Sequence, residues 1–105
     1  MKNRKEFFEY IAKNKFTVVK FTAKWCNPCK NCQPLVEECL KLLPGVDFIT
    51  IDIDDNTGIN SYYRVKAVPT FWAFRYKDPM FTAEGSDEKI ILDFFQKVAD
   101  EYSKK

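Results

Sequence analysis

Two cysteines separated by two residues, Cys26 and Cys29 in the run Trp-Cys-Asn-Pro-Cys at 25–29, are the residues best suited to chemistry. This spacing puts one thiol at the start of a helix and the other one turn inside it, so the two sulfurs can close a small, reversible disulfide. Residues 16–23 before the motif indicate an apolar, β-branched strand, and residues 30–43 after it indicate a helix. A strand that leads into a Cys-x-x-Cys at the opening of a helix is typical of a dithiol redox site.

Caps, apolar spacing and chain-breaking residues predict the elements that must position this motif. They are a helix capped by Asn3 and running to 12; a strand at 16–23; a helix from Cys26 to Pro44 and Gly45, bent at Pro34; a strand at 46–53; a short helix at 57–63; a strand at 70–74; a strand at 80–83; and a last helix capped by Ser86 or Asp87. The order αβαβαββα implies an α/β class, with a parallel strand pair and a hairpin in one mixed sheet covered by helices.

The 105 residues predict one domain, 1–105, with a single core. A net charge of +2 from scattered basic residues argues against nucleic acid or an anionic membrane as a partner. No apolar stretch is long enough for a membrane span, and Glu6 and Glu9 interrupt any secretory segment, so we expect a cytoplasmic protein. Four cysteines in that compartment are expected to be catalytic, metal-bound or free. The lack of histidine excludes a histidine-dependent triad and a His-ligated zinc site.

With this motif in this setting, the chain resembles the thioredoxin family across nearly its whole length. The family's run Trp-Cys-Gly-Pro-Cys-Lys stands here at 25–30, with Asn27 in place of glycine. Four further matches are the helix proline, Pro34; Ile-Asp at 51–52 through to Asn56; the cis-proline motif Val-Pro-Thr at 68–70; and the groove glycine, Gly85. A Cys-x-x-Cys alone is weak, but these motifs in this order are a specific signal.

The resemblance implies the thioredoxin fold and a thiol-disulfide oxidoreductase that reduces protein disulfides. Cys26 would be the exposed nucleophile, because the positive end of the helix and its free N–H groups favour a thiolate there. Cys29, more buried, would resolve the mixed disulfide by attacking Cys26 and releasing the reduced substrate.

The remaining site residues are also implied by the resemblance. Pro28 would keep the first helical turn rigid. Asn27 departs from the family's glycine, but asparagine can cap a helix and tolerates loop geometry, so the motif should still form. The residues between the cysteines influence the reduction potential of the dithiol, which we expect in the reducing half of the span from about −270 to about −120 mV. The residues expected to face the substrate are Trp25, Val68, Pro69 in a cis bond, and Gly85.

The implied partners are disulfide-containing proteins and a thioredoxin reductase that holds flavin and draws on NADPH. This chain is expected to bind no cofactor and to be a monomer. Two alternatives stay open. One is a glutaredoxin-like reductase recharged by glutathione, which Trp25 and Pro28 disfavour. The other is an interaction module in which redox activity is incidental.

Lys20 departs from the family, which usually has a buried acid six residues before the nucleophile. The family's partnering lysine on the next strand falls at Thr50. One hypothesis is that Lys20 replaces the acid, stabilising a thiolate at Cys29 or accepting its proton. The preferred interpretation is that Lys20 reaches the surface or pairs with a carboxylate such as Asp52.

The family's N-terminal strand is also expected to be absent, because Asn3 is predicted to cap the first helix. The sheet should therefore have four strands flanked by four helices, with residues 48–53 at an open edge. An open edge can pair with another chain, or the N-terminus and charged side chains can shield it.

The other cysteines, Cys32 and Cys39, suggest a four-thiolate metal site with the motif. Closed metal sites usually draw ligands from two turns or loops, whereas these cysteines follow one helix. Buried, inert thiols are the preferred interpretation, with pairing of Cys32 under oxidation left open. The carboxylates of Asp52, Asp54 and Asp55 are expected to be solvated rather than metal-bound.

Overall fold

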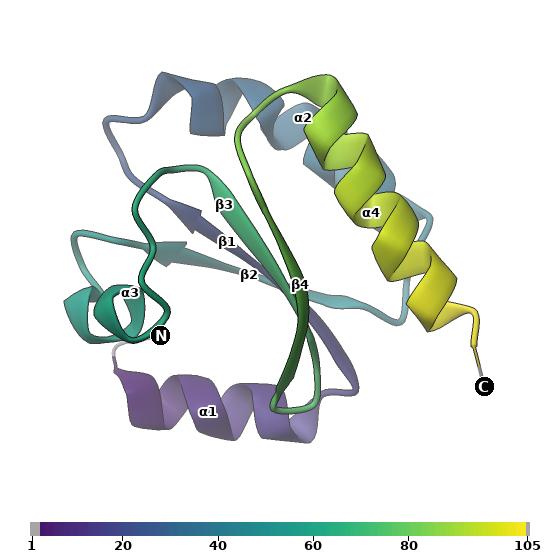
Figure 1. The fold of residues 1–105 in the computed structure, drawn as a ribbon, viewed down its shortest axis with the longest axis horizontal. Helices are drawn as coiled ribbons and strands as arrows, with labels where there is room; N and C mark the ends of the chain where they lie inside the picture. The colour runs from purple at the N-terminus through teal and green to yellow at the C-terminus, as the bar shows by residue number, and fades with distance from the viewer. Residues whose placement is uncertain (1–2, 105) are drawn as a thin grey trace.

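The computed structural model describes residues 3–104, apart from the side chain of Thr57. Its elements follow the predicted order (Figure 1). They are α1 (Arg4–Lys13), β1 (Phe16–Thr22), α2 (Asn27–Lys41), β2 (Asp47–Asp52), α3 (Thr57–Tyr62), β3 (Thr70–Arg75), β4 (Asp78–Glu84) and α4 (Glu88–Tyr102). No helix in this described part of the chain has both the length and the apolar character that crossing a membrane requires.

The four strands form one sheet in the order β2-β1-β3-β4. β1 pairs with β2 in parallel and with β3 antiparallel, and β3 forms the predicted hairpin with β4. β2 lies at an edge, as predicted. β4 begins at Asp78 rather than at residue 80, because Pro79 pairs opposite Phe74 beside an irregularity in the register. Proline is tolerated there because an edge strand does not need every N–H for pairing.

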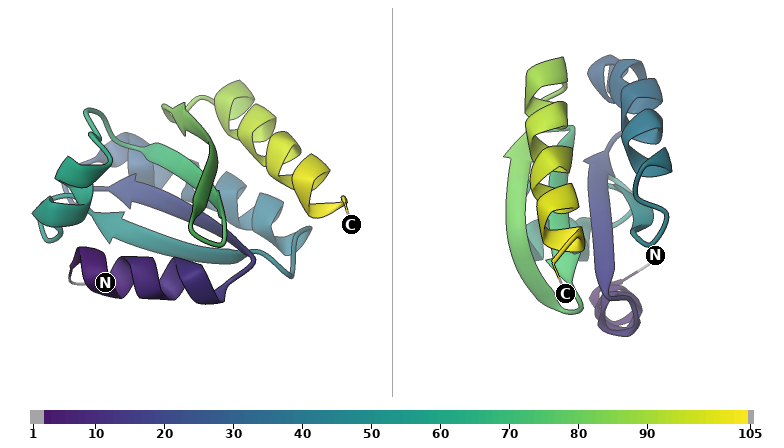
Figure 2. Two further views of the ribbon diagram at one scale, coloured as in Figure 1. Left: turned by 60° about the horizontal axis from the view of Figure 1, so that its bottom comes forward. Right: turned by 90° about the vertical axis from the view of Figure 1, so that its right-hand side faces the viewer.

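The helices cover both faces of the sheet. The views in Figures 1 and 2 place α2 and α4 on one face and α1 on the other. Alternation along β1 assigns its residues accordingly: Val18 joins the core cluster under α2 and α4, whereas Val19 and Phe21 join the cluster that contains Phe7 of α1 and Ile59 of α3. Lys20, two residues after Val18, therefore faces α2.

Local signals explain where the helices begin. The side chain of Asn3 accepts a hydrogen bond of 2.9 Å from the N–H of Glu6, which confirms the predicted cap. Cys26 caps α2, and Pro28 lies in its first turn, where the missing N–H is not needed. Asp87 is the N-cap of α4.

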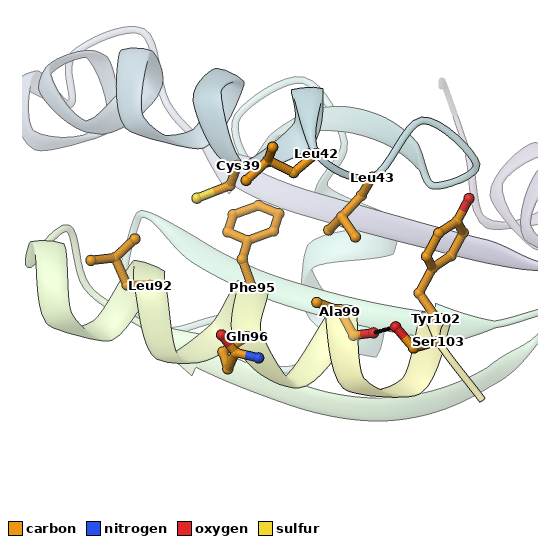
Figure 3. A pocket seen from close by; sticks show the side chains of 9 residues that line it. All are labelled: Cys39, Leu42, Leu43, Leu92, Phe95, Gln96, Ala99, Tyr102 and Ser103. Carbon is orange, nitrogen blue, oxygen red and sulfur yellow. Dashed lines mark hydrogen bonds between the residues drawn. The ribbon is translucent and has the colours of Figure 1, made fainter.

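A shallow apolar groove of about 360 Å³ runs between the end of α2 and α4 (Figure 3). Leu42, 80% exposed, and Leu92 lie on its rim, and Phe95 lines it. Cys39 also lines the groove and is only partly buried, so its predicted burial is wrong. Cys39 packs against the core cluster that includes Phe95 of α4, but its side chain also lines the open groove.

We expect Tyr63 to make the protein less stable at alkaline pH. Its ring packs edge-on against Phe7, Trp72 and Phe74, and burial raises the pKa of its hydroxyl to about 12. The folded state then holds this proton more tightly than the unfolded chain, whose tyrosine pKa is about 10. The stabilisation is complete below pH 10 and should be lost as the pH rises toward 12.

This prediction is checked by measuring the free energy of unfolding against pH for the wild type and for Tyr63→Phe, which cannot ionise. The wild type should lose stability relative to the variant across that window. Parallel curves for the two proteins would contradict the prediction.

Candidate active site

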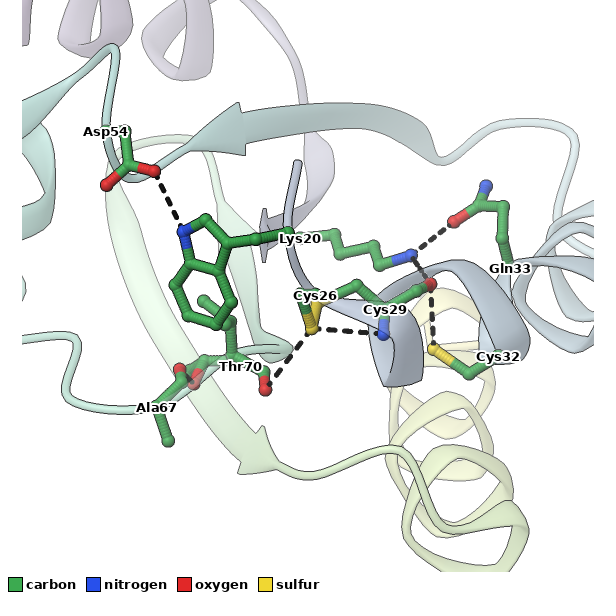
Figure 4. Close-up of a disulfide and its surroundings, with 10 residues drawn as sticks. Lys20, Cys26, Cys29, Cys32, Gln33, Asp54, Ala67 and Thr70 are labelled. Atoms are coloured by element: carbon green, nitrogen blue, oxygen red, sulfur yellow. Dashed lines mark hydrogen bonds between the residues drawn. A yellow bond between two sulfur atoms is a disulfide. The ribbon is translucent and has the colours of Figure 1, made fainter. Parts of the chain in front are cut away.

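The strand-to-helix junction after β1 brings the two motif cysteines together. The N–H of Cys26 donates to the carbonyl of Ala23 over 3.1 Å, which turns the chain out of the sheet into α2. Cys26 and Cys29 form a disulfide with Cα atoms 5.3 Å apart (Figure 4). The spacing in the sequence thus places the sulfurs where a reversible disulfide forms.

The first turn of α2 directs a backbone donor at Cys26. The N–H of Cys29 donates to Sγ of Cys26 over 3.1 Å. This amide and the positive end of the 15-residue helix both favour negative charge on that sulfur once the disulfide is reduced. The sulfur at the helix start is therefore the better leaving group and the better thiolate of the pair.

The predicted exposure of Cys26 is wrong for this disulfide form. Cys26 is 3% exposed and Cys29 1%. The two cysteines and Ala23 form a small cluster of their own, against which Ile53 and Val68 pack. The adjoining Trp25, Asn27 and Pro28 are exposed, so the disulfide lies directly beneath the surface at one end of the sheet.

The loop before β3 lies against the disulfide. The Val68–Pro69 bond is cis, as predicted, and the carbonyl oxygen of Val68 is 3.7 Å from Sγ of Cys26. The carbonyl of Pro69 accepts a 2.9 Å hydrogen bond from the N–H of Gly85. Gly85 has φ of +116°, a conformation that side chains rarely adopt, so glycine is needed here. The backbone N–H of Gly85 therefore fixes the position of the loop that contains Pro69.

Trp25 is 65% exposed, and a hydrogen bond fixes its ring beside the motif. Its indole N–H donates to Oδ2 of Asp54 over 3.0 Å. The sequence did not reveal that Asp54 orients Trp25.

The carboxylate of Asp52 accepts hydrogen bonds from the backbone N–H groups of Asp54 and Asp55. Within residues 3–104 no cluster of acidic or cysteine side chains could hold a metal ion.

The side chain of Lys20 lies under the first turns of α2, next to the backbone of Cys29. The preferred interpretation, that Lys20 reaches the surface or pairs with Asp52, is wrong. Lys20 is 3% exposed, and none of the ion pairs in the part of the chain that the structure describes joins it to Asp52. Its Nζ donates to the carbonyl of Cys29 over 2.7 Å and to Oε1 of Gln33 over 2.6 Å (Figure 4). β1 is an inner strand covered by α2, which leaves this side chain no route to water. Burial lowers the pKa of Lys20.

Cys32 is buried, as predicted, next to the same carbonyl. Its Sγ donates to the carbonyl oxygen of Cys29 over 3.4 Å, and burial raises the pKa of its thiol. Cys32 is free in this structure. The Cys29 carbonyl is thus a shared acceptor for a thiol and an ammonium, an arrangement that the sequence did not reveal.

Comparison with known proteins places these features in a family. The thioredoxin family model matches residues 1–101. Thioredoxin-1 of Saccharomyces cerevisiae is 36% identical over 90 residues, covering 86% of this chain and 87% of that protein. The thioredoxin of Trypanosoma brucei brucei has a TM-score of 0.89 at 29% identity, covering 99% of this chain and 89% of that one. Oxidised mitochondrial thioredoxin 3 of S. cerevisiae has a TM-score of 0.85 at 28% identity, covering 92% of each chain.

These matches extend over nearly the whole chain, and they agree with the four-stranded mixed sheet and with a disulfide at the start of α2. The chain therefore belongs to the thioredoxin family of thiol-disulfide oxidoreductases.

Proposed function

We propose that this protein reduces protein disulfides through Cys26 as the nucleophile and Cys29 as the resolving thiol. The thiolate of Cys26 attacks one substrate sulfur and forms a mixed disulfide, while the other substrate sulfur leaves as a thiolate and takes up a proton. Cys29 loses its proton and attacks Sγ of Cys26, which releases the second substrate thiolate. Two electrons pass to the substrate, and the Cys26–Cys29 disulfide remains. The observation that carries this assignment is the N–H of Cys29 directed at Sγ of Cys26.

The substrate is proposed to lie across Trp25 and the loop before β3. The Val68 carbonyl is adjacent to Cys26, so an extended segment that pairs with this backbone would present its sulfur to the nucleophile. Gly85 would shape this substrate-binding surface through its hydrogen bond to the Pro69 carbonyl. The exposed ring of Trp25 would form the opposite side of the same surface. Asn27 and Pro28, both exposed, would tune the dithiol without contacting the sheet.

The recharging partner is proposed to be a flavin-dependent thioredoxin reductase that draws on NADPH. We also propose that the protein works as a monomer of one domain in the cytoplasm, where the free thiols of Cys32 and Cys39 would stay reduced.

Insulin reduction supported by thioredoxin reductase but not by glutathione and its reductase would support the proposed recharging partner. The reverse pattern would contradict it.

Replacing Cys29 by serine should trap the mixed disulfide. Cys26 can still attack the substrate, but no second thiol is present to release it, so a covalent complex accumulates. We expect a substrate adduct on nearly every molecule of Cys29→Ser after incubation with an oxidised protein, seen by non-reducing electrophoresis and mass spectrometry.

The matched control is Cys26→Ser/Cys29→Ser, which should form no adduct. An adduct of Cys29→Ser that maps to Cys32 or Cys39 instead of Cys26 would show that the nucleophile is wrongly assigned.

A further inference from the structure

The ammonium of Lys20 is buried without a counter-ion. None of the ion pairs within residues 3–104 includes it. Its two hydrogen-bond partners, the Cys29 carbonyl and the Gln33 amide, are neutral. Removing a charge from water without an opposite charge is unfavourable. A fold that keeps such a group on an inner strand therefore needs a compensating interaction in some state of the protein.

The groups around Lys20 identify where that charge can arise. On α2, the titratable groups that face it are Cys32 and Glu37, besides Cys29 itself once the disulfide is reduced. Its lateral neighbours on β2 and β3 are Thr50 and Phe71, which carry no charge. Glu37 is exposed, so water screens its attraction. The motif cysteines are the buried groups near Lys20 that change charge with redox state.

We propose that Lys20 is a positioning residue whose ammonium, held on the carbonyl of Cys29, stabilises the negative charge that appears on the motif sulfurs when the disulfide is reduced. The proposal rests on the proposed function, in which Cys26 and Cys29 are the redox couple. Reduction adds two electrons and two protons to the disulfide, and ionisation of one thiol then leaves a thiolate on a motif whose backbone carbonyl, at Cys29, holds the cation. The oxidised form has no such charge for Lys20 to attract.

The redox equilibrium should therefore depend on Lys20. A cation that stabilises only the reduced form shifts the equilibrium toward the dithiol and makes the couple more oxidising. The same attraction works in reverse on Lys20. Burial lowers the pKa of Lys20 in the oxidised protein. A thiolate formed on a motif sulfur after reduction would oppose that shift. Lys20 should hold its proton to a higher pH after reduction.

The first test is the equilibrium of Lys20→Met with reduced and oxidised glutathione. Methionine keeps much of the aliphatic volume and removes the charge. We expect the equilibrium to move at least tenfold toward the disulfide, which is about 30 mV more negative for two electrons. The thiolate absorbance of the reduced variant should also appear at higher pH. Lys41→Met, which removes an exposed charge from the end of α2, is the matched control and should leave both quantities unchanged.

Lys20→Gln separates the charge from the hydrogen bond, because its amide can still donate toward Cys29. The proposal expects it to shift the equilibrium in the same direction as Lys20→Met. Wild-type behaviour of Lys20→Gln would assign the effect to the hydrogen bond and overturn the charge argument. An unshifted equilibrium in Lys20→Met would overturn the proposal as a whole.

A measurement on the wild type removes any dependence on the folding of these variants. The ¹⁵N signal of the Lys20 ammonium, followed against pH in both redox forms, should titrate at higher pH in the reduced form. Equal titrations would contradict the proposal. The glutathione equilibrium and this titration do not depend on a protein substrate, so they test the role of Lys20 separately from the proposed function. A wild-type protein that does not reduce insulin would contradict the proposed function instead.

Discussion

Cys26→Ser is expected to lose disulfide reduction almost completely, with kcat/KM lower by at least about a thousandfold, as when other enzymes lose their nucleophile. The serine hydroxyl does not ionise near neutral pH, and its oxygen cannot exchange with a disulfide. The N–H of Cys29 and the helix end would then face an uncharged group. Insulin reduction with saturating reductase measures the effect.

The control for this loss is Cys39→Ser, which removes a thiol from the groove between α2 and α4, remote from the motif. It should retain wild-type turnover. Residual activity of Cys26→Ser above a few per cent would mean that Cys29 or Cys32 can start the reaction, and the proposed order of attack would be wrong.

Phe74→Ala is expected to have the largest effect on stability, about 3–5 kcal/mol of unfolding free energy. Phe74 is fully buried on β3, and its ring packs against those of Phe7, Tyr63 and Trp72. Alanine would leave a cavity between the sheet and α1 that these rings cannot close. Domains of this size are stable by only about 5–15 kcal/mol, so the variant should lose a large fraction of its unfolding free energy.

Chemical denaturation of the oxidised proteins measures this loss. Leu42→Ala is the matched control, because Leu42 is also large and apolar but extends into solvent at the end of α2. Its stability should change by no more than about 0.5 kcal/mol. A loss below about 1 kcal/mol in Phe74→Ala would show that α1 rearranges to fill the space.

The fold could be predicted because its signals are local. The cap at Asn3, the Pro-Gly pair at 44–45 and the apolar, β-branched run at 16–23 place their elements within a few residues. The order of the elements, αβαβαββα, then predicted the parallel strand pair and the hairpin. β4 was placed too late because Pro79 suggests a turn, whereas an edge strand accommodates it.

The site was predicted less completely because its decisive contacts join distant segments. The burial of Cys26 depends on Val68, 42 residues away, which packs over it. The environment of Lys20 depends on α2 lying across β1, where Gln33 supplies an acceptor. A lysine in an apolar strand more often reaches water, and only the position of the strand inside the sheet excludes that outcome.

The disulfide belongs to a small cluster separate from the two large clusters that hold the helices on the sheet. The residues of the redox site therefore pack separately from the residues that hold the helices on the sheet. If Asn27 and Pro28 tune the dithiol as proposed, substitutions at these exposed positions should change the reduction potential with little effect on the packing of the two large clusters. Lys20 is the proposed exception, because its side chain is buried between β1 and α2 and also bonds the backbone of Cys29. A single substitution of Lys20 should therefore disturb both packing and the redox equilibrium.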